Sequence, residues 1–239
     1  MAISTAARLI TRMGLHRRSA HELVGSHVHS YRMLFAVSFY TEKWACLCYG
    51  APTTMIWSAE ADDIVKGLPE VSRLLGYRCR PALTRVTFRR HKCTGTRHLL
   101  YLGRLMDDVQ SLFESIPSRT KQTSLSYALD LHDRLLEFRA TLEREYDVFE
   151  QMDSGLAEHF RSRDVQTIFV QFTVYGLYLQ LRMLVLLPML EQTTWQALHH
   201  PAAAIRSTPQ LANLSSECEK VAAHTVRLGF RTTRLEREA

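Results

Sequence analysis

The longest apolar stretch of the sequence runs from residue 164 to residue 190 and predicts the central helix of the fold. Its length also meets the requirement of about 20 apolar residues for a membrane-spanning helix. Polar and aromatic side chains recur in it at steps of four, three and four, which places them on one stripe of a helix: Gln171, Tyr175, Tyr178 and Arg182. An arginine at mid-membrane costs about 2.5 to 3.5 kcal/mol, whereas a core helix with one wet edge has no such cost. We therefore predict a buried helix rather than a membrane span, and we expect Pro188 to kink or end it.

Two helices are predicted before this stretch. Ser4 can cap a first helix that ends at Gly14, where Leu15 is the hydrophobic partner of a glycine cap. Its predicted apolar face consists of Ala6, Leu9, Ile10 and Met13. A second helix is expected over residues 27–49, with an apolar face of Val28, Tyr31, Leu34, Phe35, Phe39 and Leu47.

Three more helices are predicted around the central one. Apolar residues at steps of three and four mark a helix over residues 102–116, which Pro117 ends. A longer helix should begin at Ser124 and reach Phe149. Thr208 and Pro209 form a favourable start for the last helix, whose buried face is predicted to hold Leu211, Leu214, Cys218, Val221, Ala222, Thr225 and Leu228.

These elements predict an all-α fold, an irregular multi-helix domain around the central apolar helix. Glycine and proline are few (10 and 7), and the aromatic and β-branched residues show no strand-like alternation. The chain has 239 residues, of which 46% are hydrophobic, so it can bury a sizeable core. We expect a single domain over residues 1–239.

The net charge of +6 is local rather than spread over the chain. Residues 71–106 contain no acidic residue and nine basic ones: Arg73, Arg78, Arg80, Arg85, Arg89, Arg90, Lys92, Arg97 and Arg104. Little helical periodicity is present there, and we predict a basic variable loop at about residues 71–98. Such a charge cluster could bind nucleic acid phosphates weakly, but no helix-turn-helix or finger frames it, and a solvated loop is the simpler interpretation.

The reactive side chains do not form a recognisable catalytic or metal site. The five cysteines are an odd number without framework spacing, which suggests reduced thiols in an intracellular protein. Cys46 and Cys48 would point about 200° apart on a helix and cannot easily share a metal ion. The sequence contains no glycine-rich phosphate loop, nucleophile elbow or HExxH motif. We therefore predict no catalytic, cofactor-binding or metal-binding residue and no enzyme activity, and the N-terminal residues show no secretory signal.

Several motifs resemble the fungal-specific transcription factor domain, the middle homology region that accompanies zinc-cluster DNA-binding domains. They lie in ARLITRMGLHR (7–17), YRMLFAVSFYTEKWACLCYGAP (31–52) and DIVKGLP (63–69). The family's Gly-Leu-His-Arg-like turn is matched by Gly14, Leu15, His16 and Arg17. Its charge pair is matched by Glu42 and Lys43, the ends of its Gly-Arg-Pro tripeptide by Gly50 and Pro52, and its Leu-Pro by Leu68 and Pro69.

The resemblance resumes near the C-terminus. LVLLPML (184–190) is similar to the family's Leu-His-Arg-Pro-x-Leu ending of a central helix, with Pro188 in place and Leu187 at the position of the arginine. The later Cys-x-x-x-Ala-Ala helix is matched by Cys218, Ala222 and Ala223.

The resemblance implies a nuclear protein that regulates transcription and pairs with family members as a homodimer or heterodimer. A zinc cluster needs six closely spaced cysteines, and this sequence has no CxxC, so we expect a fragment or shortened member without its own zinc module. Zinc would then belong to full-length relatives, and DNA would be bound only through a missing module or weakly through the basic stretch. The alternative is a helical interaction module that binds or sequesters a related factor.

Overall fold

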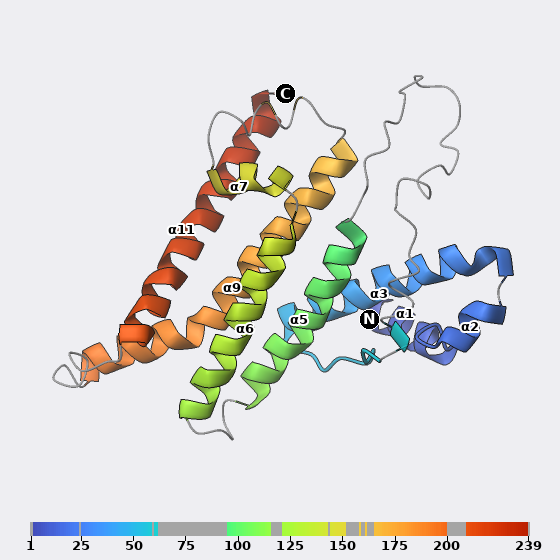
Figure 1. Ribbon diagram of the computed structural model, residues 1–239, viewed down its shortest axis with the longest axis horizontal. Helices are drawn as coiled ribbons and strands as arrows, with labels where there is room; N and C mark the ends of the chain where they lie inside the picture. Colours follow the sequence, from blue (N-terminus) through green and yellow to red (C-terminus); the bar gives the residue numbers. More distant parts are fainter. Residues whose placement is uncertain are drawn as a thin grey trace. The chain divides into compact units, whose positions relative to one another are not determined.

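The computed structural model describes residues 2–23, 25–58, 60–61, 95–115, 121–142, 144–151, 158, 161, 165–199 and 209–238. The regular structure of these residues is helical, without a strand, which confirms the prediction of an all-α fold. Figure 1 shows the helices. Their bounds are α1 Ala2–Arg12, α2 Arg18–Leu23, α3 Val28–Tyr49, α5 Gly95–Ser115, α6 Lys121–Thr141, α7 Asp147–Gln151, α9 Val165–His199 and α11 Pro209–Glu238, with 3-10 turns η1 Gly25–His27 and η3 Arg144–Tyr146.

The chain divides into two compact units, Met1–Asp107 and Asp108–Ala239. The expectation of one domain over residues 1–239 stays a prediction. Most of the basic loop predicted at about 71–98 lies outside the described residues. Its last four positions begin α5 at Gly95, so the predicted boundary with the next helix falls too late.

In the first unit, α1 ends in a Schellman motif, as its sequence predicts. Gly14 has a φ of 70° and donates its N–H to Thr11 O at 3.1 Å, and Leu15 donates to Ile10 O at 3.1 Å. The predicted N-cap is wrong, because α1 already begins at Ala2 and no residue ahead of Ser4 opposes a helix. The buried face of α1 also differs from the predicted one: Ala7 and Ile10 are buried, whereas Leu9 and Met13 are more than half exposed.

Helix α3 carries the core of this unit. Phe35, Ala36 and Phe39 are buried among Ala7, Ile10, Leu15, Met55, Ala61 and Leu100. The ring of Phe39 meets Trp57 edge-on with centroids 5.0 Å apart. The helix ends at Gly50, whose φ of 62° lets the N–H of Ala51 reach Cys46 O at 3.0 Å. Leu34, predicted to be in the core, is 47% exposed.

In the second unit, α9 packs along α6 and α11 (Figure 1). Its buried side includes Val174, Tyr175, Tyr178, Leu181 and Val185. The last helix begins at Pro209, as predicted, and buries Leu211, Leu214, Cys218, Val221 and Leu228 of the predicted face. Together these contacts place α9 between two other helices.

The polar stripe of α9 is not the wet edge that the sequence suggested. Gln171, Tyr175 and Tyr178 are all buried. Tyr175 Oη lies 3.1 Å from His224 Nε2 of α11, and Arg182 forms an ion pair with Glu217 of α11. Two members of the stripe, Tyr175 and Arg182, thus have a polar partner on the antiparallel helix α11.

Of the two outcomes expected at Pro188, a kink or a helix end, the helix end does not occur: α9 continues to His199, and its ribbon changes direction in its C-terminal half (Figure 1). One further expectation for this unit needs correction. The long helix predicted from Ser124 to Phe149 stops at Thr141. The break lets Phe149 turn onto α9, where its ring stacks on Tyr175 with centroids 5.4 Å apart.

Residues Thr167–Trp195 of α9 are long and apolar enough to cross a membrane by length and composition. Half of the most apolar window is buried inside the structure. Core helices of soluble proteins pass the same test of length and composition.

Candidate functional site

The Gly-Leu-His-Arg turn has a structural role. Leu15 is 2% exposed in the core of the first unit, and Gly14 supplies the left-handed backbone that returns the chain to that core. Arg17 donates its backbone N–H to Gly14 O at 2.8 Å and its Nε to the Nε2 of His16 at 3.3 Å. These four motif positions therefore fix the end of α1.

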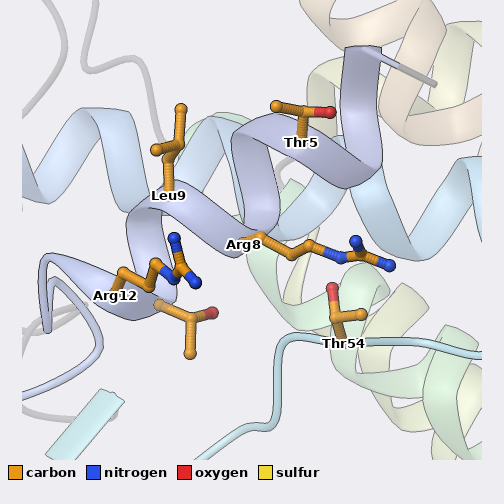
Figure 2. Close-up of a pocket in the computed structure, with 6 residues that line it drawn as sticks. Thr5, Arg8, Leu9, Arg12 and Thr54 are labelled. Atoms are coloured by element: carbon orange, nitrogen blue, oxygen red, sulfur yellow. The ribbon is translucent and has the colours of Figure 1, made fainter.

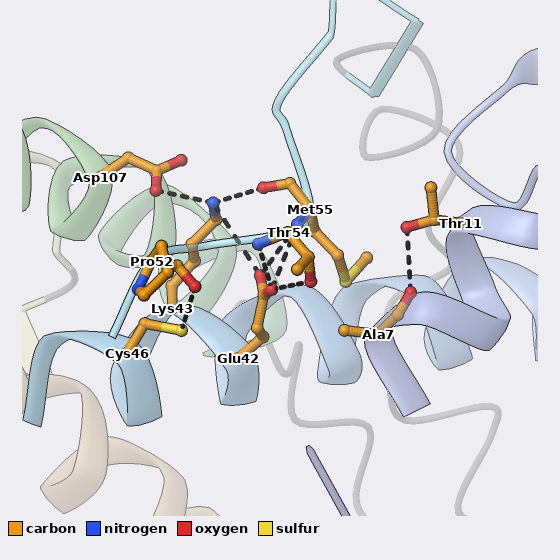
Figure 3. Close-up of polar contacts among 9 residues, drawn as sticks. All are labelled: Ala7, Thr11, Glu42, Lys43, Cys46, Pro52, Thr54, Met55 and Asp107. Carbon is orange, nitrogen blue, oxygen red and sulfur yellow. Dashed lines mark hydrogen bonds and ion pairs between the residues drawn. The ribbon is translucent and has the colours of Figure 1, made fainter. Parts of the chain in front are cut away.

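Glu42 is a buried carboxylate that holds the chain after α3. Its side chain is 2% exposed and accepts the N–H of Thr54 at 2.6 Å and that of Met55 at 3.2 Å (Figure 3). The hydroxyl of Thr54 donates to the same carboxylate. Three donors thus satisfy a charge that would otherwise be costly to bury.

Lys43 is buried beside it, with 1% of its side chain exposed. Its Nζ lies 2.6 Å from Asp107 Oδ1, donates to Met55 O and is 4.0 Å from Glu42 Oε2 (Figure 3). The ammonium also lies 5.1 Å from the centroid of the Phe39 ring. One lysine therefore connects α3, the segment at Met55 and α5.

We call Glu42, Lys43, Thr54, Met55 and Asp107 the α3 network. It balances buried charges within one unit and fixes an otherwise irregular segment. Removing either buried charge would leave polar groups of this network with fewer partners in a region that water reaches poorly.

The turn between α3 and this segment contains the next motif positions. Gly50 adopts the left-handed conformation, and the Sγ of Cys46 lies 3.5 Å from Pro52 O. Burial raises the pKa of the Cys46 thiol, and the nearby Glu42 charge raises it further, which disfavours the reactive thiolate. This cysteine is therefore a packing residue.

An open pocket of about 400 Å³ lies beside the α3 network. Helix α1 contributes most of its lining, and Thr54 contributes from the irregular segment (Figure 2). We call it the α1 pocket, and it is lined by Thr5, Arg8, Leu9, Thr11, Arg12 and Thr54. Two arginines and three hydroxyls make it polar and positively charged.

The remaining motif positions do not join this site. Leu68 and Pro69 lie outside the described residues, as do Arg73 to Arg90 of the basic stretch. Pro188, Cys218, Ala222 and Ala223 belong to the second unit, where Cys218 is buried and its Sγ lies 3.9 Å from Met183 O. Among the residues that the structure describes, no group of three or more His, Cys, Asp or Glu side chains could hold a metal ion.

Sequence reasoning missed three parts of the site. Thr54, a partner of Glu42, lies 12 positions further along in an irregular segment, and Asp107, a partner of Lys43, lies on another helix; no local pattern points to either. The third part, the pair Arg8 and Arg12, could have been recognised in the sequence, because residues four apart share one face of a helix.

One comparison identifies relatives of the chain. Residues 1–161 match the family model described as the fungal specific transcription factor domain. No curated protein sequence and no solved structure matches the chain. The match covers more than half of the 239 residues and includes the Gly-Leu-His-Arg turn and the α3 network. The chain therefore belongs to the fungal specific transcription factor domain family.

Proposed function

We propose that this chain regulates transcription in the nucleus, as the regulatory domain of a zinc-cluster-type fungal transcription factor. The observation that carries the proposal is the family match over residues 1–161. The α3 network supports it, because the motif pair Glu42 and Lys43 is buried and each side chain has polar partners. A regulatory domain needs such a folded scaffold but no catalytic group.

Contact with DNA would come from outside this sequence. The sequence has five cysteines and no CxxC, too few thiolates for the two metal ions of a zinc cluster. We propose that the chain acts through a zinc-cluster module on a dimeric partner from the same family or on a longer form of the protein. The chain itself would bind no zinc and no specific DNA sequence.

A tethering experiment tests this function. The chain is fused to an unrelated DNA-binding domain in a fungal cell carrying the matching reporter gene, and the DNA-binding domain alone is the reference. We expect reporter expression to change in either direction. Lys43→Met should reduce the effect and Arg134→Met, a change at a half-buried surface pair, should not. Equal reporter expression with the fusion and the reference would contradict the proposal.

Localisation is tested separately by fluorescence microscopy of the tagged chain. Nuclear enrichment is the expected result, and exclusion of the chain from nuclei would count against the nuclear assignment even if the tethered fusion is active.

A second candidate function is that of an interaction module that binds or sequesters a related factor. Three large apolar side chains of α9 and α11 favour it: Phe169 is 69% exposed, Leu198 72% and Phe230 75%. Co-purification with a full-length zinc-cluster relative should fall when Phe169 and Phe230 are both replaced by serine. The alternative fails if the wild-type chain retains no such relative.

A further inference from the structure

The α1 pocket has a lining that attracts anions. Arg8 and Arg12 lie four residues apart on α1 and both are exposed. Figure 2 shows Arg8 extending toward Thr54 across the pocket. Among the residues that the structure describes, the lining contains no acidic side chain, and no carboxylate forms an ion pair with either arginine. Two positive charges therefore face one concave space.

The walls of the pocket are fixed before any ligand arrives. Thr54 is held from behind by the buried Glu42, which accepts its backbone N–H at 2.6 Å. Helix α1 is anchored by Ala7 and Ile10, which are 1% and 4% exposed. Because these groups are already ordered, a ligand would pay little conformational entropy on the protein side.

The chemistry of the lining defines the ligand class. A guanidinium presents a planar fork of donors that matches a carboxylate or a phosphate. The hydroxyls of Thr11 and Thr54 already donate to Ala7 O and to Glu42, so the two arginines supply the donors for the ligand. Leu9, 54% exposed, offers an apolar surface for a short carbon skeleton. A volume of about 400 Å³ is in the range of small-molecule sites, whereas a nucleic acid backbone needs an extended basic track.

We propose that the α1 pocket binds a small organic dianion, whose carboxylate or phosphate groups are held by Arg8 and Arg12. This site goes beyond the proposed function, since binding can be measured whether or not the chain regulates transcription. A ligand there would contact Thr54 and so the outer side of the α3 network, which gives it a route to stabilise the first unit.

Isothermal titration of the full chain tests the proposal with three probes. Succinate represents dicarboxylates, glycerol 2-phosphate represents phosphate monoesters, and acetate is the monoanion reference. We expect saturable one-site binding of succinate or of glycerol 2-phosphate, about tenfold or more tighter than acetate. The probe that binds more tightly identifies the acidic group, and its affinity should fall as salt is raised.

Substitutions locate the site. Arg8→Ala and Arg12→Ala should each weaken binding about tenfold or more, because each removes a charge-assisted hydrogen bond. Arg227→Ala removes an exposed charge from α11 and should leave the affinity unchanged. Leu9→Glu keeps both arginines but adds an acid to the lining, and it should abolish binding. Circular dichroism should show the same helix content in all four variants.

Three results would overturn the proposal. The first is the absence of saturation by both dianions at millimolar concentration. The second is an equal loss of affinity in Arg227→Ala and in the two pocket variants, which would mean diffuse charge attraction. The third is displacement of the bound dianion by a short DNA duplex of much higher affinity, which would identify α1 as a nucleic acid surface.

Discussion

Lys43 is the side chain whose replacement should disturb the first unit most. It is 1% exposed, and its ammonium joins Asp107 at 2.6 Å and Met55 O. Lys43→Met keeps most of the volume but removes the donor that Lys43 provides to the Met55 carbonyl and to Asp107. Because Asp107 is 28% exposed and can recover some hydration, we expect a loss of about 2 to 4 kcal/mol in the free energy of unfolding.

Urea unfolding followed by circular dichroism measures this loss, and Arg134→Met is the matched control. Arg134 also pairs with an aspartate at 2.6 Å, but both side chains of that pair are about 30% exposed. Replacing it should cost about 1 kcal/mol or less. Equal losses for the two variants would show that burial does not set the strength of the Lys43 contacts.

His98 should make stability depend on pH. Its burial in the first unit lowers its pKa from 6.5 to about 4. The folded protein thus binds this proton less tightly than the unfolded chain, so the stability that depends on neutral His98 is complete above about pH 6.5 and is lost as pH falls toward 4. We expect a loss of about 1 to 3 kcal/mol in this window.

Unfolding experiments at a series of pH values check this expectation. His98→Gln should flatten the curve between about pH 6.5 and 4, because glutamine cannot take up the proton that favours unfolding. A curve of unchanged slope in this variant would assign the acid sensitivity to other groups, such as His132 and His224, whose pKa values burial also lowers.

At the residue scale, the sequence predicted which groups matter better than it predicted what they contact. Glu42 and Lys43 were found through the resemblance, yet Asp107 is 64 positions from Lys43 in the sequence, and only the fold brings them together. The ion pair of Arg182 was missed for the same reason, because its partner Glu217 lies on another helix. Side-chain pairing over such separations leaves no local pattern.

At the scale of the helices, two glycines should respond in opposite directions to alanine. A Cβ at Gly176 in α9 would meet nothing within 4 Å, so Gly176→Ala should stabilise the fold by about 0.5 to 1 kcal/mol through helix propensity. A Cβ at Gly103 in α5 would lie 3.1 Å from the ring of Phe39. That ring is fully buried against Trp57 and cannot move freely.

We therefore expect Gly103→Ala to destabilise the protein by about 1 kcal/mol, because overpacking outweighs the gain in helix propensity. Thermal unfolding of both variants provides the measurement. A higher melting temperature for Gly103→Ala would mean that Phe39 can shift at little cost.

Helix ends were predictable where a residue forces them. Gly14 and Gly50 have positive φ, and Pro209 suits a first turn, so these three boundaries follow from backbone chemistry. The break after Thr141 has no such residue. Beyond the break, Arg139 pairs with Asp147 and Glu150, and Phe149 stacks on Tyr175, a contact that exists only once α9 is in place.

For the whole molecule, the local charge of the chain separates two kinds of anion binding. The basic stretch of residues 71–106 belongs to no recognisable DNA-binding motif and would attract nucleic acid only weakly. The α1 pocket, in contrast, is a concave site lined mainly by one helix. Both would weaken with salt, but only the pocket should saturate with one small dianion per chain. The stoichiometry of the titration thus distinguishes them.

The last prediction concerns α9, which is apolar enough to cross a membrane yet carries Arg182 at 14% exposure in an ion pair with α11. If α9 is a core helix, the wild-type chain should leave the membrane pellet on carbonate extraction. Arg182→Leu should then cost about 1 to 3 kcal/mol, since it leaves the two-thirds-buried Glu217 without a partner. The double variant with Glu217→Leu should recover much of that loss, because an apolar pair can replace a buried ion pair.

A membrane span would behave in the opposite way. Removing Arg182 from a span would strengthen insertion by about 2.5 to 3.5 kcal/mol, so Arg182→Leu would hold the chain more firmly in the pellet. The two cases are separated by fractionating wild type, single and double variants in parallel, with light scattering to exclude aggregates. Wild-type chain that stays in the extracted pellet without aggregation would show that α9 inserts in lipid. Its contacts with α11 would then have to form within the membrane, and the proposed nuclear location would fall with the core-helix interpretation.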